Sequence, residues 1–307
     1  MDNIPSCFAK GMTISDLAIK YDVFWLRQTL AGFLREDIRT GDITSNAVVS
    51  ANRLAEAEIV CKTDGATLCG TYETEMIFDI CNCITKSLVR EGSEMQAGST
   101  VMNVQGSALA ILQAERTALN ILMRMSGIAT ETRRLVNIVN DKSVRIAATR
   151  KTAPGLRYFD KKAVIVGGGH PHRIALDDMV LIKDNHLVIA GSVRNAMDLA
   201  RKNLDRGVKV ECEAKNPEEA IEAIAKGVDI VLLDNFSEQQ VEKTILEIER
   251  RKMRKNVLIE VSGGINPSNI SGYARAKPDI ISVGYITHSP HAVDFSLEIC
   301  RSWDQKR

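Results

Sequence analysis

The sequence is poor in the residue types that mark fibrous, disulfide-linked and nucleic-acid-binding proteins. Its 307 residues include 20 Gly, 7 Pro and 7 Cys, and aromatic residues make up only 5%. This is too little Gly and Pro for a collagenous or disordered chain. An odd number of cysteines is typical of reduced thiols rather than of a disulfide framework. Lys and Arg exceed Asp and Glu by 40 − 39 = 1, so no overall charge directs the chain to nucleic acid.

Long apolar segments are missing as well. No apolar run reaches the length of about 18 residues that a transmembrane helix needs. The stretch from Met1 through Asp16 contains Asp2 and Pro5 and lacks the apolar centre of a signal peptide. We therefore expect a cytoplasmic protein without membrane contact. At roughly 150 residues per domain, the length predicts two domains, or one barrel-sized domain with an addition.

Two cysteines stand close together. Cys81 and Cys83 form a C-x-C pair, a spacing that occurs in zinc sites, but no second pair of Cys or His follows at metal-ligand spacing. The alternative is that both thiols are small apolar residues that fill space in a core. Both interpretations remain open at this point.

The second half of the chain repeats one pattern. Short, β-branched apolar runs alternate with helix-like segments, which is typical of βα units in a parallel sheet or barrel, where buried strands are continuously apolar. The predicted strands are Val144–Ala148, Met179–Ile182, Val208–Cys212, Ile230–Leu233, Val257–Val261 and Ile280–Val283.

Each of these strands ends in polar or glycine residues. The exits are Thr149–Lys151, Lys183–Asn185, Glu213, Asp234–Asn235, Ser262–Gly264 and Gly284. Because the carboxyl ends of parallel strands lie at one edge, we expect these residues to converge on one pocket. The alternative is that they are merely polar because loops are polar.

The first half of the chain lacks this alternation of strands and helices, and its pattern predicts an α+β domain. A helical segment is expected over Ser15–Leu34, and strands over Glu56–Lys62, Met76–Cys81 and Thr100–Val104. A further helix is expected over Ala108–Met125, with Ser107 as its N-cap and Gly127 as its end. Its polar stripe consists of Gln113, Arg116, Asn120 and Arg124, and a solvent-facing surface is the default interpretation of such a stripe.

Charge is concentrated in one third of the chain. The cations there are Arg150, Lys151, Arg157, Lys161, Lys162, His172, Arg173 and Lys183. Arg forks match carboxylates and phosphates, so the cluster predicts a polyanionic ligand. Glu213 and Asp234 oppose it, either as ligands for Mg²⁺ or as salt-bridge partners of the cations.

Two glycine-rich segments complete the set. Gly167–Gly169 precedes His172, and Ser262–Gly264 leads from a strand towards a predicted helix over Pro267–Arg275. Exposed backbone N–H groups at such an exit bind phosphate. A turn is the alternative, since paired glycines serve turns more often than sites.

Several motifs together resemble one known family. Thr149–Arg157, Gly167–Gly169 with His172–Arg173, and Ile182–His186 closely resemble the quinolinate phosphoribosyltransferases. Further matching blocks are Glu36–Asp37, Gly41–Thr44, Ala114–Arg116 with Asn120, Ser126–Thr130, Leu233–Phe236, and Gly284 with Thr287–Ser289. One departure is Pro171, where many bacterial members have Asn. Archaeal members are similar to this chain here, and the change removes only the contacts that the Asn side chain would make.

The resemblance implies a fold and a domain organisation. An N-terminal α/β sandwich domain over 1–115 would precede an open, incomplete (β/α) barrel over 116–290, with the site at the C-terminal ends of its strands. A C-terminal helix over 291–307 would pack back on the N-terminal domain. The resemblance also implies a homodimer, or a hexamer of three dimers, in which Arg116 enters the partner subunit's site.

The implied activity joins quinolinate to 5-phosphoribosyl 1-pyrophosphate and releases carbon dioxide and pyrophosphate, in NAD biosynthesis. Lys151, Glu213 and Asp234 would be catalytic, and the two acids would hold Mg²⁺ partly through water and substrate. The implied substrate-binding residues are Arg116, Thr149, Arg150, Lys151, His172, Arg173, Lys183, Ser262, Gly263, Gly264, Gly284 and His288.

Four alternatives stay open. A molybdenum-transport-associated relative and nicotinate phosphoribosyltransferase share the fold. A Schiff-base aldolase would place a reactive lysine, here Lys183, on a barrel strand, but such a lysine needs an apolar pocket. A non-catalytic anion-binding module would explain the cations but not Glu213 and Asp234.

Overall fold

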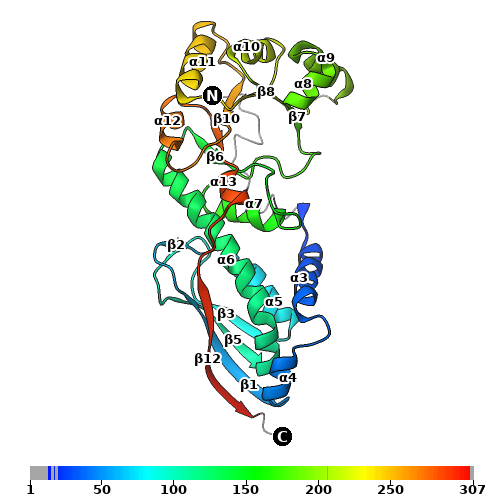
Figure 1. Cartoon of the computed structure of the whole chain (residues 1–307), viewed down its shortest axis with the longest axis vertical. Coiled ribbons are helices and arrows are strands. Elements are labelled where there is room, and N and C mark those ends of the chain that lie inside the picture. Colours follow the sequence, from blue (N-terminus) through cyan, green and yellow to red (C-terminus); the bar gives the residue numbers. More distant parts are fainter. Residues whose placement is uncertain (1–12, 15–16, 18–19, 206, 305–307) are drawn as a thin grey trace. The chain divides into compact units, whose positions relative to one another are not determined.

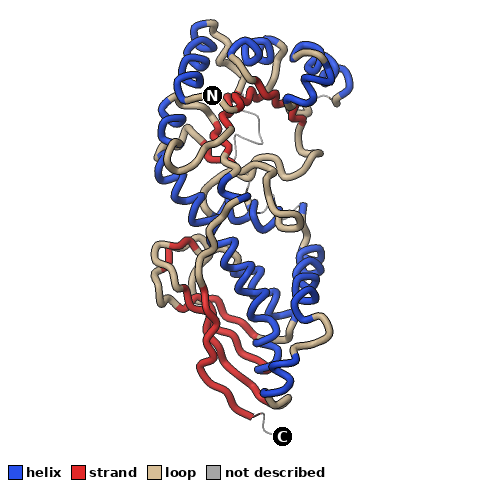
Figure 2. The backbone as a smooth tube through the Cα atoms, in the orientation of Figure 1, coloured by secondary structure: helices blue, strands red, loops and turns tan. Residues whose placement is uncertain are grey.

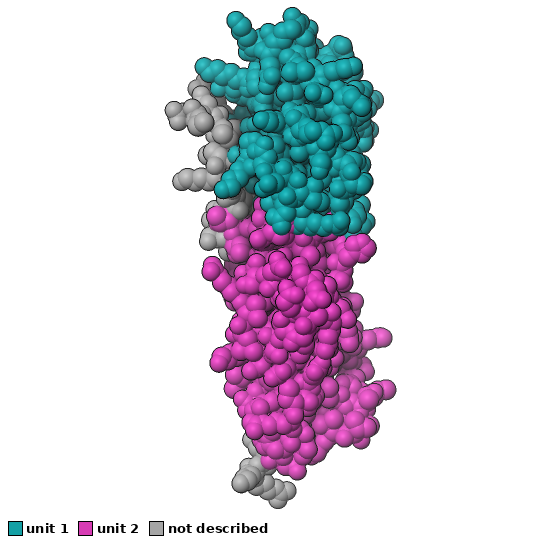
Figure 3. Space-filling model, turned by 90° about the vertical axis from the view of Figure 1, so that its left-hand side faces the viewer, with its two compact units in different colours: residues 1–12, 134–157, 169–289 teal, residues 13–133, 158–168, 290–307 magenta. Residues whose placement is uncertain are grey.

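The computed structural model describes residues 13–14, 17, 20–205 and 207–304. The predictions for Met1–Asp16 and for the start of the helix over Ser15–Leu34 therefore lie mostly outside the described residues. The chain forms two compact units (Figure 3). We call residues 134–157 and 169–289 the barrel unit, and residues 13–133, 158–168 and 290–307 the sheet unit. The units are interleaved along the chain, whereas the expected domains were contiguous.

The barrel unit contains a six-stranded parallel sheet in the order β6-β11-β10-β9-β8-β7. Its strands confirm the predicted apolar runs and are β6 (Arg145–Ala147), β7 (Val180–Ile182), β8 (Val210–Ala214), β9 (Ile230–Asp234), β10 (Leu258–Ser262) and β11 (Ile280–Ser282). The order places β6 and β7 at the two edges, so the sheet stays open, as an incomplete barrel requires.

One face of this sheet changes in character along the strands. Ile230 and Leu258 lie level near the amino ends, with the buried Glu211 beside Ile230, and they belong to a buried apolar cluster with Met179, Ile280 and Ala147. Two residues further along, Leu232 lies level with Glu213 on one side and Glu260 on the other. At the carboxyl ends, Asp234 and Ser282 both lie level with Ser262. Because alternate strand residues share a face, this face becomes polar towards the strand exits.

Helices follow the strands, and those that follow β7 to β10 lie on the outer side of the curved sheet (Figures 1 and 2). Their starts are set locally, since the side chains of Ser192, Asn216 and Ser237 each accept a backbone N–H of the first turn. The helices are α8 (Asp184–Ala190), α9 (Val193–Asn203), α10 (Pro217–Ala225), α11 (Glu238–Arg250), α12 (Ile270–Arg275) and α13 (Tyr285–His288).

The sheet unit contains a four-stranded antiparallel sheet in the order β12-β1-β5-β3 and a small pair, β2-β4. Helices α3, α5 and α6 lie along one side of the larger sheet (Figure 1). Leu26, Leu30 and Leu34 of α3 recur every fourth residue and are buried, which gives the helix one apolar face. The elements are α3 (Val23–Ile38), α4 (Ile43–Val48), β1 (Arg53–Cys61), β2 (Ala66–Thr67), α5 (Thr71–Ile80), β3 (Ile84–Ser87), β4 (Glu94–Met95), β5 (Thr100–Ser107) and β12 (Phe295–Asp304).

Two helices, α6 (Ala108–Val139) and α7 (Arg157–Val166), contribute residues to both units. The prediction that Gly127 ends the first of them is wrong, because the helix continues for another 12 residues to Val139. A Cβ on Gly127 would collide with the carbonyl oxygen of His291. The glycine therefore permits a close approach of the chain inside a helix and does not mark its end.

The strand expected over Met76–Cys81 is also wrong, since these residues belong to α5 and its C-cap. Met76, Ile77 and Phe78 are all buried there. A short apolar run buried on every side has no periodicity that separates a strand from a helix.

The C-terminal helix expected over 291–307 is corrected to a strand. Strand β12 pairs with β1 in antiparallel register, from Phe295 opposite Cys61 to Asp304 opposite Arg53. Phe295, Leu297 and Ile299 alternate with polar residues, as in a strand with one apolar face, up to the register shift opposite Glu56 and Ala57.

Among the described helices, none combines the length and the apolar composition needed to span a bilayer.

Candidate functional site

The carboxyl end of the barrel sheet is hollowed into a cavity of about 220 Å³. The residues of three strand exits line it, because β10, β11 and β6 are neighbours in the sheet. The structure thereby brings together all the residues expected to hold phosphate, which are Lys151, Ser262, Gly263, Gly264, Gly284 and His288.

Glycine is needed in this cavity for steric reasons. Gly263 has a φ of +105°, and a Cβ there would collide with Asn235. A Cβ on Gly284 would lie 3.2 Å from Cδ of Lys151. The hydroxyl of Thr287 donates to the carbonyl oxygen of Lys151 at 2.9 Å, and the N–H of Lys151 donates to Oγ1 of Thr149 at 3.1 Å. The loop that carries Lys151 is therefore fixed from both sides.

Glu213 and Asp234 lie at the carboxyl ends of the adjacent strands β8 and β9, beside this cavity. Nζ of Lys183 lies 3.3 Å from Oε1 of Glu213, and the N–H of Asp184 donates to Oε2 of Glu213 at 3.1 Å. Burial and the charge of Glu213 raise the pKa of Asp234, while Lys183 and Lys151 lower it by a smaller amount. The four charged groups thus act on one another across one small space.

The two carboxylates suit a divalent cation. Burial, and after it the charge of Glu213, disfavours the ionised form of Asp234, and a bound cation would offset both effects. Mg²⁺ is bound through one or two carboxylates together with water and phosphate oxygens, so the donor set fits it.

Two arginines form a second cationic group. Burial and the charge of Arg150 lower the pKa of Arg173, so the two guanidinium groups lie close enough to repel. The Arg173 side chain is 7% exposed, and its Nη1 lies 3.5 Å from the carbonyl oxygen of Met179. Among the described residues, Nε of Arg150 is buried without a hydrogen-bond partner. A buried cation next to a half-buried one is stabilised by an anionic ligand.

His172 was expected to bind substrate directly, but its ring nitrogens have partners within the protein. Nε2 lies 2.9 Å from Oε2 of Glu260 and 3.4 Å from Oε2 of Glu211. Burial opposes a charge on His172, but Glu260 and Glu211 outweigh burial and raise its pKa to about 10. Nδ1 accepts the N–H of Arg173 at 2.7 Å, which requires a lone pair there. The hydrogen-bonded ring is therefore the neutral tautomer with its proton on Nε2, whereas the second proton that the two glutamates favour would have to displace the bond at Nδ1.

Glu211 and Glu260 were not identified from the sequence. Each lies inside a strand, and their exposed fractions are 0% and 2%. The available signal was a charged residue within an otherwise apolar strand run, because such residues are rarely buried without a partner. Together with His172, they form a group of three possible metal-ligand residues, with ligand atoms all within 4.8 Å of one another.

Other expected site residues lie elsewhere. Arg116 belongs to α6 in the sheet unit; its side chain is 59% exposed and lies 3.7 Å from Glu115. Lys162 is buried against Glu73 in the sheet unit, so the cation cluster seen in the sequence does not act as one group. Arg124, from the polar stripe, makes a two-fold hydrogen bond to the buried Asp160.

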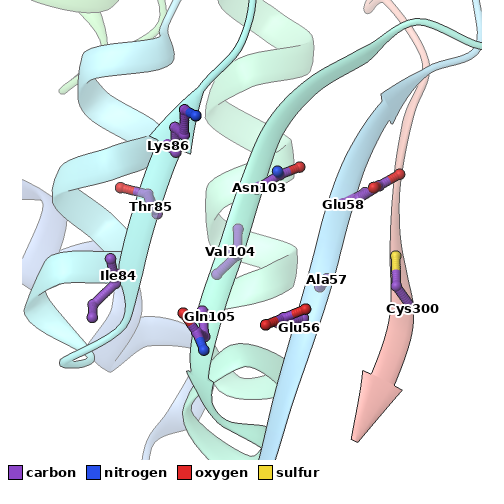
Figure 4. A pocket seen from close by; sticks show the side chains of 10 residues that line it. All are labelled: Glu56, Ala57, Glu58, Ile84, Thr85, Lys86, Asn103, Val104, Gln105 and Cys300. Carbon is purple, nitrogen blue, oxygen red and sulfur yellow. The ribbon is translucent and has the colours of Figure 1, made fainter.

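The sheet unit has a cavity of its own, of about 360 Å³, on strands β1, β3, β5 and β12 (Figure 4). Its two carboxylates have partners, since Glu56 pairs with Arg301 at 2.7 Å and Glu58 accepts from Thr100 at 3.2 Å. Cys83, near this sheet, is buried, and its burial raises the thiol pKa to about 11. Within the described parts of the chain, Cys81 and Cys83 belong to no group of three metal-ligand residues.

Comparisons with known proteins agree with this arrangement. Residues 42–126 match the N-terminal domain of quinolinate phosphoribosyl transferase, and residues 128–298 match its C-terminal domain. A Methanothermobacter thermautotrophicus protein named "Probable nicotinate-nucleotide pyrophosphorylase (carboxylating)" is 43% identical over 274 residues, which is 87% of this chain and 96% of that protein. The human nicotinate-nucleotide pyrophosphorylase (carboxylating) is 35% identical over 94% of this chain and 96% of its own.

Solved structures lead to the same family. The crystal structure of NadC from Streptococcus pyogenes superposes with a TM-score of 0.84 at 34% identity, covering 92% of this chain and 98% of that one. The fold expected from the sequence, an α/β domain joined to an open barrel, is thereby confirmed. The chain belongs to the quinolinate phosphoribosyl transferase family.

Proposed function

We propose that this chain transfers the phosphoribosyl group of 5-phosphoribosyl 1-pyrophosphate to quinolinate and releases carbon dioxide. The products are nicotinate mononucleotide and pyrophosphate. One observation carries the proposal. The guanidinium groups of Arg150 and Arg173 lie close to each other, and Arg150 directly precedes Lys151, which lines the cavity. A site for a diacid thus adjoins a site for phosphates.

The diacid would be held by Arg150, Arg173 and Lys183. Arginine forks bind carboxylates through two parallel hydrogen bonds. The buried Nε of Arg150, which lacks a partner among the described residues, would gain one from a ligand carboxylate. Thr149 would support the loop through its bond to the N–H of Lys151.

The phosphates would occupy the glycine-lined cavity. Lys151 and His288 supply side-chain donors there, and Ser262, Gly263, Gly264 and Gly284 supply a hydroxyl and backbone N–H groups. Backbone amides in glycine-rich turns bind phosphate oxygens without steric hindrance.

Glu213 and Asp234 would act at the ribose. The ring nitrogen of quinolinate forms a bond to C1 of the ribose as the bond from C1 to the pyrophosphate oxygen breaks. Positive charge develops on the ribose, and the nearby carboxylates stabilise it. Mg²⁺ held by the same carboxylates would neutralise charge on the pyrophosphate leaving group.

Decarboxylation completes the reaction. The ribosylated ring nitrogen is cationic, so the ring accepts the electron pair left when the adjacent carboxylate departs as carbon dioxide. That carbon then takes up a proton. No covalent bond to the protein is needed, and the side chains act by orienting the substrates and excluding water.

The proposal includes a homodimer, or a hexamer of three dimers, in the cytoplasm. A site shared between two subunits is supported by Arg116, an exposed cation whose acidic partner is 3.7 Å away on the adjacent residue. In such a dimer Arg116 would reach the carboxylates bound in the partner subunit. Mixing the inactive variants Arg116→Ala and Lys151→Ala should then restore activity, because mixed dimers contain one intact site. No recovery after subunit exchange would exclude a shared site.

The central test measures products. The purified protein is given Mg²⁺ and 5-phosphoribosyl 1-pyrophosphate with either quinolinate or nicotinate, and mononucleotide and carbon dioxide are both quantified. Equal amounts of both products from quinolinate, lost in Lys151→Ala, would support the proposal. Turnover of nicotinate alone would show that the fold carries the related reaction without decarboxylation.

A further inference from the structure

We infer that Glu211 and Glu260 are positioning residues for the diacid subsite, and that they act through His172 on Arg173. The inference rests on the proposed function and extends it to residues that touch no substrate. It also gives His172 a role different from direct substrate binding.

The first step is the burial of the two carboxylates. Glu211 and Glu260 lie on β8 and β10, on either side of β9, and their exposed fractions are 0% and 2%. A buried charge costs several kcal/mol unless a partner compensates it. Among the described residues neither carboxylate oxygen of Glu211 has a hydrogen bond, although Nε2 of His172 lies 3.4 Å away. His172 is therefore the group around which both carboxylates are arranged.

The second step is the backbone at His172. Its φ of 54° is in the left-handed region, which a non-glycine residue adopts only when its surroundings enforce it. The N–H of His172 donates to Nδ1 of His170 at 2.9 Å. His170 is in turn fixed to β6 by backbone bonds with Ile146 and Ala148. The loop is thus attached to three strands, through backbone bonds to β6 and through the His172 ring to β8 and β10.

The third step leads to Arg173. Its backbone N–H donates to Nδ1 of His172 at 2.7 Å. The His172 ring, which faces the two carboxylates, therefore also fixes the backbone of Arg173. The Arg173 guanidinium then lies within electrostatic range of Arg150 and of Glu211. Release of the His172 ring would let Arg173 move away from Arg150, whose charge repels it.

A metal ion is the other occupant that this geometry admits. The charges disfavour it, because the carboxylates of Glu211 and Glu260 already face the His172 ring, and Arg173 contributes a further cation. A divalent ion bound to the ring would have to displace the proton on Nε2 that faces the two carboxylates.

The test compares variants that remove the carboxylates with one that keeps the shape. Glu260→Ala and Glu211→Ala are expected to raise the KM for quinolinate at least tenfold. The KM for 5-phosphoribosyl 1-pyrophosphate should stay within twofold. Glu260→Gln keeps an oxygen that can accept the Nε2 proton, so its effect should be several-fold smaller than that of Glu260→Ala. Should the alanine variants fail to fold, Glu260→Gln and Glu211→Gln carry the same comparison.

Asp279→Asn is the matched control. It changes a half-buried carboxylate of the same sheet at the opposite ends of the strands, where Asp279 accepts the N–H of Ile259. It should lower the melting temperature and leave both KM values unchanged.

Three results would overturn the inference. One is an equal rise of both KM values in the Glu260 variants, and another is unchanged kinetics. The third is one equivalent of transition metal that the wild-type protein retains and Glu260→Ala loses. Failure of the wild-type protein to turn over quinolinate would refute the proposed function and this inference with it. Normal wild-type turnover with unaltered variants would refute this inference alone.

Discussion

Lys162 and Glu73 form an ion pair in the interior of the sheet unit, with Nζ 2.8 Å from Oε2 and exposed side-chain fractions of 3% and 0%. The hydroxyl of Tyr158 donates to the same carboxylate at 2.9 Å. Burial alone would lower the pKa of Lys162, but the charges of Glu73 and Glu91 raise it instead. The lysine is therefore held charged by its partners.

Glu73→Gln should destabilise the protein by about 3–5 kcal/mol, because it leaves a buried ammonium without its main partner. Denaturant unfolding measures the loss. The control is Asp79→Asn, which removes a carboxylate from Arg27 at the surface, where the two side chains are 45% and 66% exposed. That change should cost about 0–1 kcal/mol. Equal losses in the two variants would contradict the assigned role of the buried pair.

Asn235→Gly should move the acid limb of the pH profile to higher pH. Nδ2 of Asn235 donates to Oδ2 of Asp234 at 2.7 Å, and this bond lowers the raised pKa of Asp234. Without the donor the pKa rises further, so less of the carboxylate is ionised at a given acidic pH. Glycine tolerates the φ of 57° at this position. We expect kcat/KM to fall below the wild-type value on the acid side and to match it near pH 8.

A profile that shifts to lower pH, or falls equally at every pH, would show that Asp234 does not control the acid limb.

Gly263→Ala and Gly264→Ala should differ, although both glycines have positive φ, +105° and +62°. A Cβ at Gly264 meets open space, so the cost is the strain of the backbone alone, about 1 kcal/mol. A Cβ at Gly263 would in addition displace Asn235. We expect a larger loss of stability in Gly263→Ala, with weaker binding of pyrophosphate, which calorimetry can measure. Similar effects of the two changes would mean that Asn235 can move aside at little cost in free energy.

Gly127→Ala should destabilise the protein even though alanine favours helices by about 1 kcal/mol over glycine. The new Cβ would strike the carbonyl oxygen of His291. Gly32→Ala in α3 is the matched control, since its Cβ would meet nothing nearer than Nη2 of Arg35 at 3.7 Å. That variant should gain up to about 1 kcal/mol. Thermal unfolding of both decides the matter, and a stabilised Gly127→Ala would refute the close contact.

The barrel strands could be predicted because each is a buried, continuously apolar run that ends in polar residues. Val257–Val261 and Ile230–Leu233 show this clearly, and the strands β10 and β9 are found there. The same rule fails at Met76–Phe78, because a run buried on all sides fits a helix equally well. At Gly127 the sequence could not reveal that residue 291 approaches the helix, since that contact depends on tertiary structure alone.

The site was predictable to the extent that its residues stand at strand exits. Lys151, Ser262 and Gly284 come from separate strands and line one cavity. The exceptions are Glu211 and Glu260, which lie inside strands and act on a neighbouring side chain. Their role depends on the orientation of the His172 ring, and no spacing in the sequence encodes that orientation.

The pairing of β1 with β12 has a consequence for the order in which the protein is made. Arg53 and Asp304 lie opposite each other although 251 residues separate them. At about 5–20 residues per second, the ribosome releases β12 roughly 10–50 s after β1. During that interval β1 presents an open edge, and unpaired edges recruit other chains. Messages truncated before the codon for Phe295 should therefore yield products that aggregate, even though every residue of the barrel sheet has been made.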